Sequence, residues 1–273
     1  MKKQISGILT KHGFVCKAQL MTYPHIDPVF FRIGPLQMRW YGLMYILGFI
    51  CSYFIALNLT KRKQYDMSRG ELEDLLSWCI AALIIGARLG YCLFYNFSFY
   101  LAHPLRCFAV WEGGMSFHGG LIGLILTGLL YAYKKNKSFL MLADIGALSA
   151  IPGLFFGRLG NFITGELYGR ITDVPWGMVF PDGGFFPRHP SQLYEAFSEG
   201  IILFLIIYFI SRKASRHGIM ISWFLICYGA IRFFLEFFRE PDVHLGFIVS
   251  ILSMGQILCI AMMVTGALLL TLV

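Results

Sequence analysis

The sequence predicts an all-α polytopic membrane protein with about seven transmembrane helices and a small extracytoplasmic cap formed by its outer loops. Of the 273 residues, 57% are hydrophobic and only 14% are charged, against about 25% charged in an ordinary soluble domain. The apolar residues are gathered into runs close to the roughly 20 residues that a helix needs to cross a bilayer. These two observations exclude a soluble enzyme.

Seven apolar runs mark the expected spans in chain order. They are Met38 to Leu59, Leu75 to Tyr95, Phe117 to Tyr133, Leu140 to Phe162, Leu193 to Ile210, Ile219 to Phe238 and Phe247 to Val273. The runs that contain glycine and arginine fit the pattern least well. Residues 1–20 are expected to be an N-terminal extension, and residues 21–273 a single transmembrane catalytic domain.

Lysine and arginine predict the orientation. The loops after the first, third and fifth runs carry Lys61, Arg62, Lys63, Arg69, Lys134, Lys135, Lys137, Arg212, Lys213 and Arg216, whereas the opposing loops carry only Arg106, Arg170, Arg188 and Arg239. The positive-inside rule therefore places the N-terminus outside and the C-terminus in the cytoplasm. The basic residues of the extension favour the opposite orientation. The largest outer loop, residues 163–192, is expected to form much of the cap.

The net charge of +8 does not indicate nucleic-acid binding. The basic residues lie in short runs between apolar segments, where they set topology and contact anionic membrane lipids. Most cysteines lie inside apolar runs and no C-x-x-C pair occurs, so we interpret them as small fillers of helix packing and expect no metal site. The cysteines in the runs are Cys51, Cys79, Cys92, Cys227 and Cys259.

Ionisable residues inside a bilayer are costly and mark functional sites. Mapping each span at about 1.5 Å per residue puts five polar side chains in the outer half of the membrane, namely Tyr41, Arg88, His118, Arg158 and Arg232. Three arginines and a histidine favour an anion, most simply a phospholipid phosphate, which guanidinium binds through two hydrogen bonds. We therefore predict a cationic pocket open toward the outer leaflet.

The alternative is that each arginine is paired with a carboxylate. Arg232 and Glu236 are four residues apart and would share a helix face, and Glu195 and Glu199 are available to the other arginines. Near the end of the fourth run, Asn161 is suited to orienting a lipid head group and Glu166 to holding Arg158. The tripeptide Arg-Leu-Gly occurs at Arg88 and again at Arg158, which leaves an internal repeat open.

His118 stands in the segment Ser116-Phe117-His118-Gly119-Gly120, where it is either an interface histidine or a catalytic base. The glycines allow close approach of a neighbouring helix or a ligand. The likeness to the oxyanion loop of lipases is weak, because no G-x-S-x-G motif accompanies it. Asp144, in the middle of the fourth run, is expected to be a structural partner of an arginine or a backbone group.

Five ordered motifs support a family assignment. They are Trp40-Tyr41-Gly42-Leu43-Met44-Tyr45, His118-Gly119-Gly120-Leu121-Ile122-Gly123, Arg158-Leu159-Gly160-Asn161-Phe162, His189-Pro190-Ser191-Gln192-Leu193-Tyr194-Glu195, and Tyr228-Gly229-Ala230-Ile231-Arg232-Phe233 followed by Glu236 and Arg239. From about Tyr23 to its C-terminus the chain resembles the prolipoprotein diacylglyceryl transferases, bacterial membrane enzymes. One departure is Thr164, where the family usually has Asn; a hydroxyl replaces only part of an amide's hydrogen bonding.

The resemblance implies transfer of the sn-1,2-diacylglyceryl group of phosphatidylglycerol to the lipobox cysteine thiol of a preprolipoprotein, with glycerol phosphate released. It implies no cofactor and no metal. The partners would be phosphatidylglycerol, preprolipoprotein signal peptides with a lipobox cysteine, and membrane lipids, at the bacterial inner membrane. The active site would open toward the outer leaflet.

The same resemblance assigns residues to roles. Family positions carry over to His118, Arg158 and Arg232, and from their chemistry we hypothesise that His118 accepts the thiol proton while the two arginines stabilise the departing phosphate. Arg88 and Asp144 are expected to be structural or supporting. The residues expected to bind substrate, with Arg158, are Tyr41, Asn161, Glu166, Gly169, Tyr228, Glu236 and Arg239.

Two rival functions remain open at this level. An anion transporter would also use buried arginines and broken helices, but it needs polar positions on both sides of the membrane midplane, and the charges here favour one half. A lipid-binding scaffold would not need a histidine beside the arginines.

Overall fold

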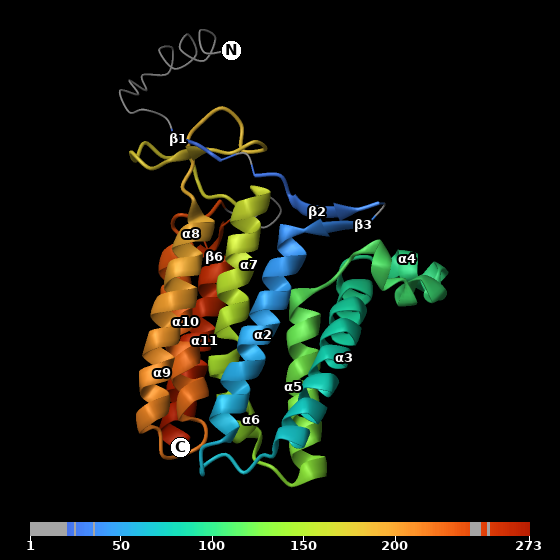
Figure 1. The fold of residues 1–273 in the computed structure, drawn as a ribbon, viewed down its shortest axis with the longest axis vertical. Coiled ribbons are helices and arrows are strands. Elements are labelled where there is room, and N and C mark those ends of the chain that lie inside the picture. Colours follow the sequence, from blue (N-terminus) through green and yellow to red (C-terminus); the bar gives the residue numbers. More distant parts are fainter. Residues whose placement is uncertain (1–20, 25, 35, 241–246, 250–251) are drawn as a thin grey trace. The chain divides into compact units, whose positions relative to one another are not determined.

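A computed structural model describes residues 21–24, 26–34, 36–240, 247–249 and 252–273 (Figure 1). The expected N-terminal extension, residues 1–20, lies outside the described residues. The chain divides into two compact units. Unit 1 comprises Met1–Phe54, Ala147–Ala214 and Ile219–Val273, and unit 2 comprises Ile55–Gly146 and Ser215–Gly218.

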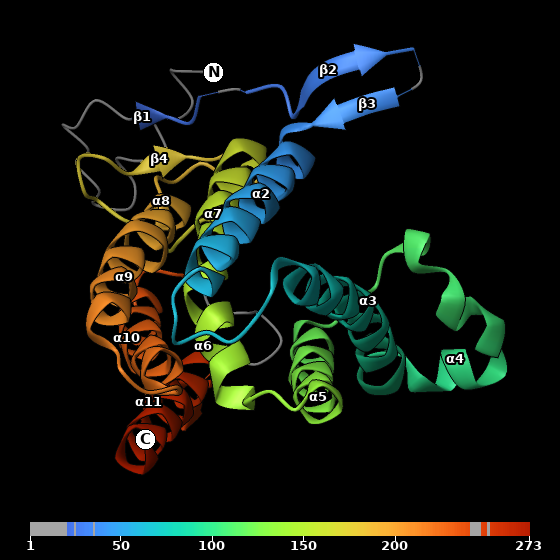
Figure 2. The same ribbon diagram turned by 60° about the horizontal axis from the view of Figure 1, so that its bottom comes forward.

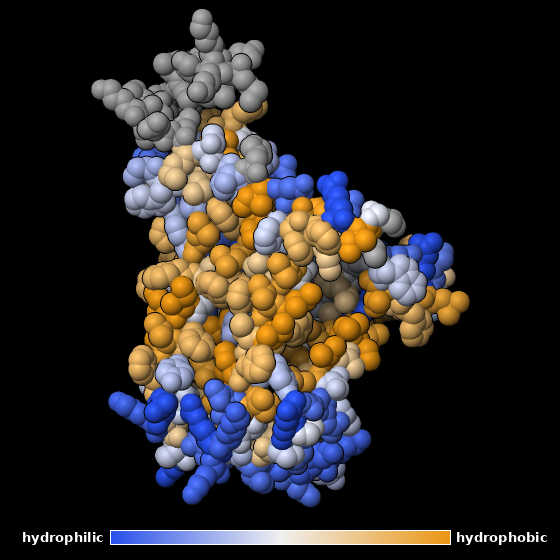
Figure 3. All heavy atoms as spheres, viewed as in Figure 1, coloured by the Kyte–Doolittle hydropathy of each residue, from blue (hydrophilic) through white to orange (hydrophobic). Residues whose placement is uncertain are grey.

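Five helical stretches in the described residues are long and apolar enough to cross a membrane. They are α2 (Trp40–Thr60), α3 (Arg69–Phe94), α6 with α7 (Phe139–Thr164), the stretch from α8 to α9 (Ser191–Lys213) and α11 (Met254–Leu272). Large apolar side chains are exposed along them, and Figure 3 shows hydrophobic atoms over most of one face. The prediction of a mainly helical membrane protein is confirmed, and the count of seven spans stays a prediction.

The other two expected spans are helical but depart from an ordinary span. Helix α10 (Ile219–Leu235) is apolar and shorter than the other five. Helix α5 (Phe117–Lys135) is not among the five candidates, because His118, its glycines and its terminal lysines lower its mean hydropathy. It packs closely on α3 instead. A Cβ on Gly86 would lie 2.5 Å from the Gly119 carbonyl oxygen, so only glycine allows this helix contact.

The loops at the helix ends of unit 2 are held by polar contacts. Helix α3 begins with a capping box, in which the Ser68 hydroxyl accepts from the Glu71 amide. The Lys137 ammonium pairs with Asp66 at 3.1 Å. Asp144, 1% exposed, accepts a hydrogen bond from the Gly218 amide at 2.7 Å. This contact is of the backbone kind that the sequence predicts for Asp144.

Unit 1 is a bundle in which small residues let helices approach. Helices α10 and α11 lie side by side in both ribbon views (Figures 1 and 2). A Cβ on Gly266 would lie 2.6 Å from the Ser222 carbonyl oxygen. Between α8 (Ser191–Glu195) and α9 (Leu203–Lys213), residues Ala196–Ile202 form the π-helical segment η3, which packs on α7 (Ile151–Thr164).

The last expected span begins later than predicted. The sequence predicts one run from Phe247, whereas Phe247–Val249 (β5) and Leu252–Ser253 (β6) are antiparallel strands and α11 starts at Met254. A capping box starts the helix there. The Ser253 hydroxyl accepts from the Gln256 amide at 3.2 Å, and the Ser253 amide donates to the Gln256 side chain at 3.1 Å. The six mainly apolar residues before the cap, 247–252, therefore do not belong to the helix.

The segment expected to form the cap is folded through backbone pairing. Strand β4 (Met178–Val179) pairs in parallel with β1 (Met21–Thr22), and isolated bridges join Gly169 to Arg239 and Ile171 to Arg188. The Arg188 guanidinium donates to the Gly183 carbonyl at 2.7 Å. A separate hairpin, β2 (Val29–Ile33) with β3 (Leu36–Arg39), leads into α2. The position of these segments outside the membrane stays a prediction.

Candidate functional site

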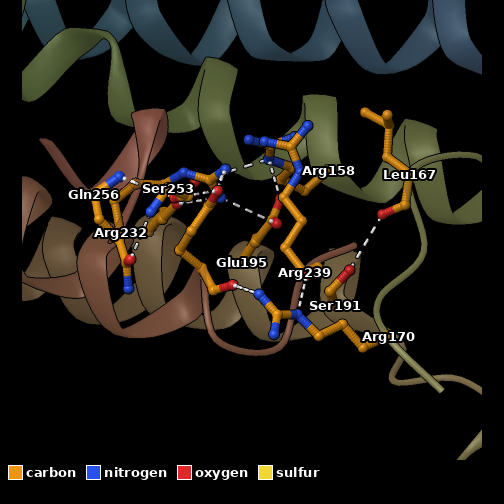
Figure 4. Close-up of polar contacts among 11 residues, drawn as sticks. Arg158, Leu167, Arg170, Ser191, Glu195, Arg232, Arg239, Ser253 and Gln256 are labelled. Atoms are coloured by element: carbon orange, nitrogen blue, oxygen red, sulfur yellow. Dashed lines mark hydrogen bonds and ion pairs between the residues drawn. The ribbon is translucent and has the colours of Figure 1, made fainter. Parts of the chain in front are cut away.

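Two of the predicted arginines meet around shared carboxylates in unit 1 (Figure 4). The Arg158 Nε on α7 lies 2.7 Å from the Glu195 carboxylate, and the Arg232 Nη1 on α10 lies 3.1 Å from its other oxygen. Glu195 ends α8 and is 2% exposed in its side chain. Three helices therefore converge on one carboxylate that both guanidinium groups contact.

A second carboxylate, that of Glu199, also lies near both guanidinium groups. Glu199 is fully buried, and its oxygens lie 3.7 Å from the Arg158 guanidinium and 3.6 Å from that of Arg232. It belongs to η3, and π-helical turns are frequent at functional sites because they re-aim side chains. Gly200 next to it permits the close packing, since a Cβ there would lie 2.7 Å from the Phe155 ring.

The third carboxylate connects the cluster to α11. Glu236 accepts from Arg232 Nη2 at 3.1 Å and from the Ser253 hydroxyl at 3.0 Å. The i to i+4 pairing of Arg232 with Glu236 is the one that the sequence predicts. Tyr228, one turn before Arg232, lies within electrostatic reach of both arginines and of Glu195 and Glu199, and its ring stacks on Phe224.

The predicted cationic pocket is therefore wrong for this cluster. Two guanidinium groups face three carboxylates, Glu195, Glu199 and Glu236, which is the paired alternative. The physical reason is that a buried charge without a partner costs several kcal/mol, roughly 3–5 for a broken pair. Within the described residues, a predicted Arg158–Glu166 ion pair is also absent. Glu166 is exposed, and Arg158 pairs with Glu195 instead.

The two arginines differ in their remaining hydrogen-bonding capacity. Arg232 uses both Nη atoms on carboxylates, and its side chain is 11% exposed. Arg158 makes its closest contacts to Glu195 and Glu199 through Nε, and its side chain is 21% exposed. In the described part of the chain no hydrogen bond is formed by its Nη1 or Nη2. The Nη1 and Nη2 donors of Arg158, whose geometry suits a phosphate, are thus available to a ligand, whereas those of Arg232 are not.

Tyr41, Asn161 and Glu166 lie together near the end of α7. The Tyr41 hydroxyl is 3.2 Å from that of Tyr45 and interacts with the Asn161 side chain and the Glu166 carboxylate. Gly160 makes room for the Tyr41 ring, which lies 2.9 Å from the position of a Cβ there. Thr164 stands where the family usually has Asn. Its hydroxyl bonds within its own helix, donating to the carbonyls of Gly160 and Asn161, each 3.2 Å away.

Gly169 and Arg239 pair through their backbones. A side chain on Gly169 would overlap the Phe238 carbonyl oxygen and the His189 backbone, so this glycine is required for packing of the folded loop. The Arg239 carbonyl accepts from Arg170 Nε at 2.7 Å, and Figure 4 places Arg239 beside the carboxylate cluster. Arg239 therefore lies beside the cluster, and Gly169 is paired with it through the backbone.

Arg88 does not provide an anion site. Its side chain lies in unit 2, 3% exposed, and donates to the carbonyls of Cys107 at 2.9 Å and Arg106 at 2.6 Å, and also to that of Gly113. Its guanidinium also lies over the Tyr100 ring. None of the partners of Arg88 in the described residues is acidic. The guanidinium is saturated by carbonyl groups, which makes it an organiser of the loop after α3.

His118 also belongs to unit 2. It is exposed in the first turn of α5, where the Ser116 hydroxyl caps the helix by accepting from the Gly119 amide at 3.3 Å. The Ser116 amide donates to the Ala87 carbonyl at 2.9 Å, so the turn is anchored on α3 beside Arg88. A convergence of His118 with the arginine cluster stays a prediction.

The sequence singled out no role for His189, which the structure places in a polar network with Tyr194 and Trp176. Its Nδ1 lies 3.2 Å from the Tyr194 hydroxyl, which accepts from the Trp176 indole at 2.6 Å. Burial lowers the pKa of His189 below its usual value, and Asp173 opposes this more weakly. The only sequence feature that pointed to His189 was the motif that begins with it, His189-Pro190-Ser191-Gln192-Leu193-Tyr194-Glu195. Within the described residues no group of His, Cys, Asp and Glu side chains is arranged to hold a metal ion.

The chain is similar in sequence to known proteins of one family. A family model described as prolipoprotein diacylglyceryl transferase matches residues 28–272. The chain is 55% identical over 246 residues to the phosphatidylglycerol–prolipoprotein diacylglyceryl transferase of Geobacter sulfurreducens, covering 90% of this chain and 95% of that protein. It is 51% identical over 248 residues to the protein of that name from Aliivibrio salmonicida, covering 91% and 88%. The chain therefore belongs to the prolipoprotein diacylglyceryl transferase family.

Proposed function

We propose that this protein transfers the diacylglyceryl group of phosphatidylglycerol to the lipobox cysteine of preprolipoproteins, the activity that names its relatives. The observation that carries the proposal is the Arg158 guanidinium, anchored on buried carboxylates through Nε while its Nη atoms remain available. A guanidinium held in this way presents two parallel donors to a phosphate without having to leave its partners.

Arg232 and the three glutamates hold the charge of the site in place. Arg232 shares the Glu195 carboxylate with Arg158. It would therefore contribute a fixed positive charge beside the phosphate as the bond between phosphate and glycerol breaks. Preorganised charge of this kind stabilises a developing anion without reorganisation during the reaction. Tyr41, Asn161 and Glu166, grouped at the end of α7, would orient the glycerol and hydroxyl groups of the head group, with Tyr228, Gly169, Glu236 and Arg239 bordering it.

The chemical step is a displacement at carbon. The lipobox thiol loses its proton to His118, and the thiolate sulfur attacks the glycerol carbon that carries the phosphate. The carbon–oxygen bond breaks, its electron pair stays on the phosphate, and glycerol phosphate leaves as the thioether forms. His118 is suited to the role because an exposed imidazole in a helix's first turn can reach a substrate proton.

The proposal includes a location. The enzyme would lie in the bacterial inner membrane with its N-terminus outside, its C-terminus in the cytoplasm and its site toward the outer leaflet, as the distribution of lysine and arginine predicts. Membrane lipids would contact the exposed apolar faces of the helices. The signal peptide with its lipobox cysteine would approach from the same leaflet as the lipid.

The test is direct transfer with purified components. Full-length protein, phosphatidylglycerol and a lipobox peptide are expected to give a thioether-linked peptide, detected by mass spectrometry, and the matched peptide with serine for cysteine is expected to give none. Replacing phosphatidylglycerol with phosphatidylcholine in the same assay tests which class of phospholipid the protein uses as donor. If His118→Gln keeps near-normal transfer while Arg158→Ala abolishes it, the assignment of His118 as base is wrong and the arginine assignment stands. No thioether from the wild-type protein would contradict the proposed activity.

A further inference from the structure

Two cysteines lie on contacting segments of unit 2, whereas the arginine cluster belongs to unit 1. Cys92 lies on α3 and is 4% exposed, and Cys107 is half-buried in the short segment η1 (Pro104–Phe108). The segment that carries Cys107 packs against α3, the helix that carries Cys92. Both are reduced in this structure. Neither has a part in the proposed chemistry of lipid transfer.

Hydrogen bonds from Arg88 hold the segment that carries Cys107 against α3. Cys92 is four residues after Arg88, so both side chains project from one face of α3. Arg88 Nε donates to the carbonyl oxygen of Cys107 itself at 2.9 Å, and Nη2 donates to that of Arg106 at 2.6 Å. The guanidinium therefore fixes the backbone of Cys107 against the helix that carries Cys92.

The backbone geometry is compatible with a covalent link. A disulfide needs Cα atoms within about 7 Å and side chains that point toward each other. Helix α3 and segment η1 are in backbone contact, and Cys92 lies on the face of α3 from which Arg88 reaches the carbonyl of Cys107. Half-burial leaves Cys107 accessible to a reagent, whereas Cys92 is buried.

We propose that Cys92 and Cys107 form a disulfide by thiol–disulfide exchange with an oxidant of the extracytoplasmic compartment. The Cys107 thiolate attacks the disulfide of the oxidant, forming a mixed disulfide and releasing one thiol. The Cys92 thiolate then attacks the Cys107 sulfur and releases the second thiol. Two protons and two electrons pass from the pair to the oxidant, which is reduced to two thiols.

The compartment follows from the proposed orientation, on which this part of the inference rests. Cys92 and Cys107 flank the end of α3 that the distribution of basic residues places outside, where disulfides form and persist. The bond would close the chain from residue 92 to residue 107 and hold η1 on α3. It would thereby reinforce the segment that leads to Ser116, which anchors the turn carrying His118.

The experiment uses the full-length purified protein and oxidised glutathione as the oxidant. After acid quenching, denaturation and alkylation, peptide mass spectrometry is expected to show a Cys92–Cys107 cross-linked peptide and two fewer alkylated thiols. The oxidised protein is expected to unfold about 5 °C higher than the reduced one, because a link of this loop length restricts the unfolded chain. Cys92→Ser and Cys107→Ser each remove the cross-link and the thermal shift.

Cys227→Ser is the matched control, because Cys227 lies on α10 in unit 1, and it is expected to change neither readout. Full alkylation of both cysteines after oxidation, or a glutathione adduct on Cys107 with no cross-link, overturns the proposal. In cells, trapping of free thiols is expected to find the pair oxidised. A pair that oxidises when purified but is reduced in cells overturns the extracytoplasmic disulfide and the orientation beneath it, and leaves the transfer activity to be decided by its own assay.

Discussion

The same tripeptide, Arg-Leu-Gly, stands near the end of two helices and serves two different purposes. In unit 2, Arg88 is 3% exposed and donates to a set of main-chain carbonyls. In unit 1, Arg158 is more exposed, and its contacts are to the carboxylates of Glu195 and Glu199. A guanidinium saturated by carbonyls has a structural role, whereas one anchored along a single edge keeps donors for a ligand. The partners, and not the local sequence, determine the function of the arginine.

Arg158→Ala is expected to have the largest effect. Removing the proposed phosphate ligand should lower transfer by about 10³-fold or more, as for other preorganised groups that stabilise a developing anion. Arg158→Lys should lose less, because it keeps the charge and loses the paired donors. Thioether formation by purified, folded protein is the measurement. Retention of a large share of wild-type activity by Arg158→Ala would remove the distinction between the two arginines.

Glu195→Gln is expected to damage both stability and transfer. The substitution removes the carboxylate that both guanidinium groups share, and breaking a buried ion pair costs roughly 3–5 kcal/mol. The matched control is Glu240→Gln, because Glu240 pairs with Arg188 at a side chain that is 46% exposed, where a pair contributes about 0–1 kcal/mol. Thermal unfolding and transfer would be measured for both. Equal effects in the two variants would contradict the account of the cluster.

Arg88→Ala should act on stability and leave the chemistry of transfer unchanged. The loss of its guanidinium leaves several loop carbonyls without donors, at a cost of about 1–3 kcal/mol each if they stay buried. We expect a lower unfolding temperature, with the folded fraction keeping transfer within about threefold of wild type. Weaker binding of phosphatidylglycerol by the folded variant would instead show that Arg88 belongs to the site.

The glycines of the two Arg-Leu-Gly tripeptides, Gly90 and Gly160, are also expected to differ in role, with smaller effects on substitution than the arginines. A Cβ on Gly90 would lie 2.7 Å from the Gly119 Cα, whereas one on Gly160 would lie 2.9 Å from the Tyr41 ring. Gly90→Ala should therefore cost about 1–3 kcal/mol by forcing α3 from α5. Gly160→Ala should mainly move Tyr41 and raise the KM for lipid. Unfolding temperature and steady-state kinetics separate the two outcomes, and the reverse pattern would contradict the assignment.

The smallest expected effect lies in the loop before α8 and depends on pH. Burial lowers the folded-state pKa of His189 below its usual value, so the folded protein favours the neutral imidazole. Its contribution to stability is present above the unfolded pKa of about 6.5 and is lost as pH falls through the lower folded pKa. Thermal unfolding of His189→Gln should therefore depend less on pH below about 6.5 than that of the wild type. Parallel pH profiles would contradict this.

The fold was largely predictable because apolar length and periodic composition decide which segments cross a bilayer. Five expected spans reappear as helices of spanning length. The start of the last helix was not predictable from hydropathy, since a capping box at Ser253 begins it after an apolar strand. The hydropathy of α5 is lowered by the glycines that let it pack on α3.

The sequence singled out both arginines of the carboxylate cluster but did not predict the electrostatics of the cluster. Local spacing shows that Arg232 can pair with Glu236. The meeting of Arg158 and Arg232 on Glu195 depends on three helices and a π-helical segment, and no local pattern specifies these. The carbonyl shell around Arg88 depends likewise on a loop that returns to α3. The charges alone therefore predicted a cationic pocket, and the tertiary structure supplies the acids that neutralise it.

Binding of phosphatidylglycerol to the folded protein tests most directly the claim that Arg158, unlike Arg88, is a phosphate ligand. Native mass spectrometry in matched detergent would compare the wild type with Arg158→Ala and Arg88→Ala. We predict that Arg158→Ala weakens binding by about 10- to 100-fold, the value of a charged hydrogen-bonding group, and that folded Arg88→Ala binds like the wild type. Wild-type affinity in Arg158→Ala, or equal losses in both variants, would contradict the account.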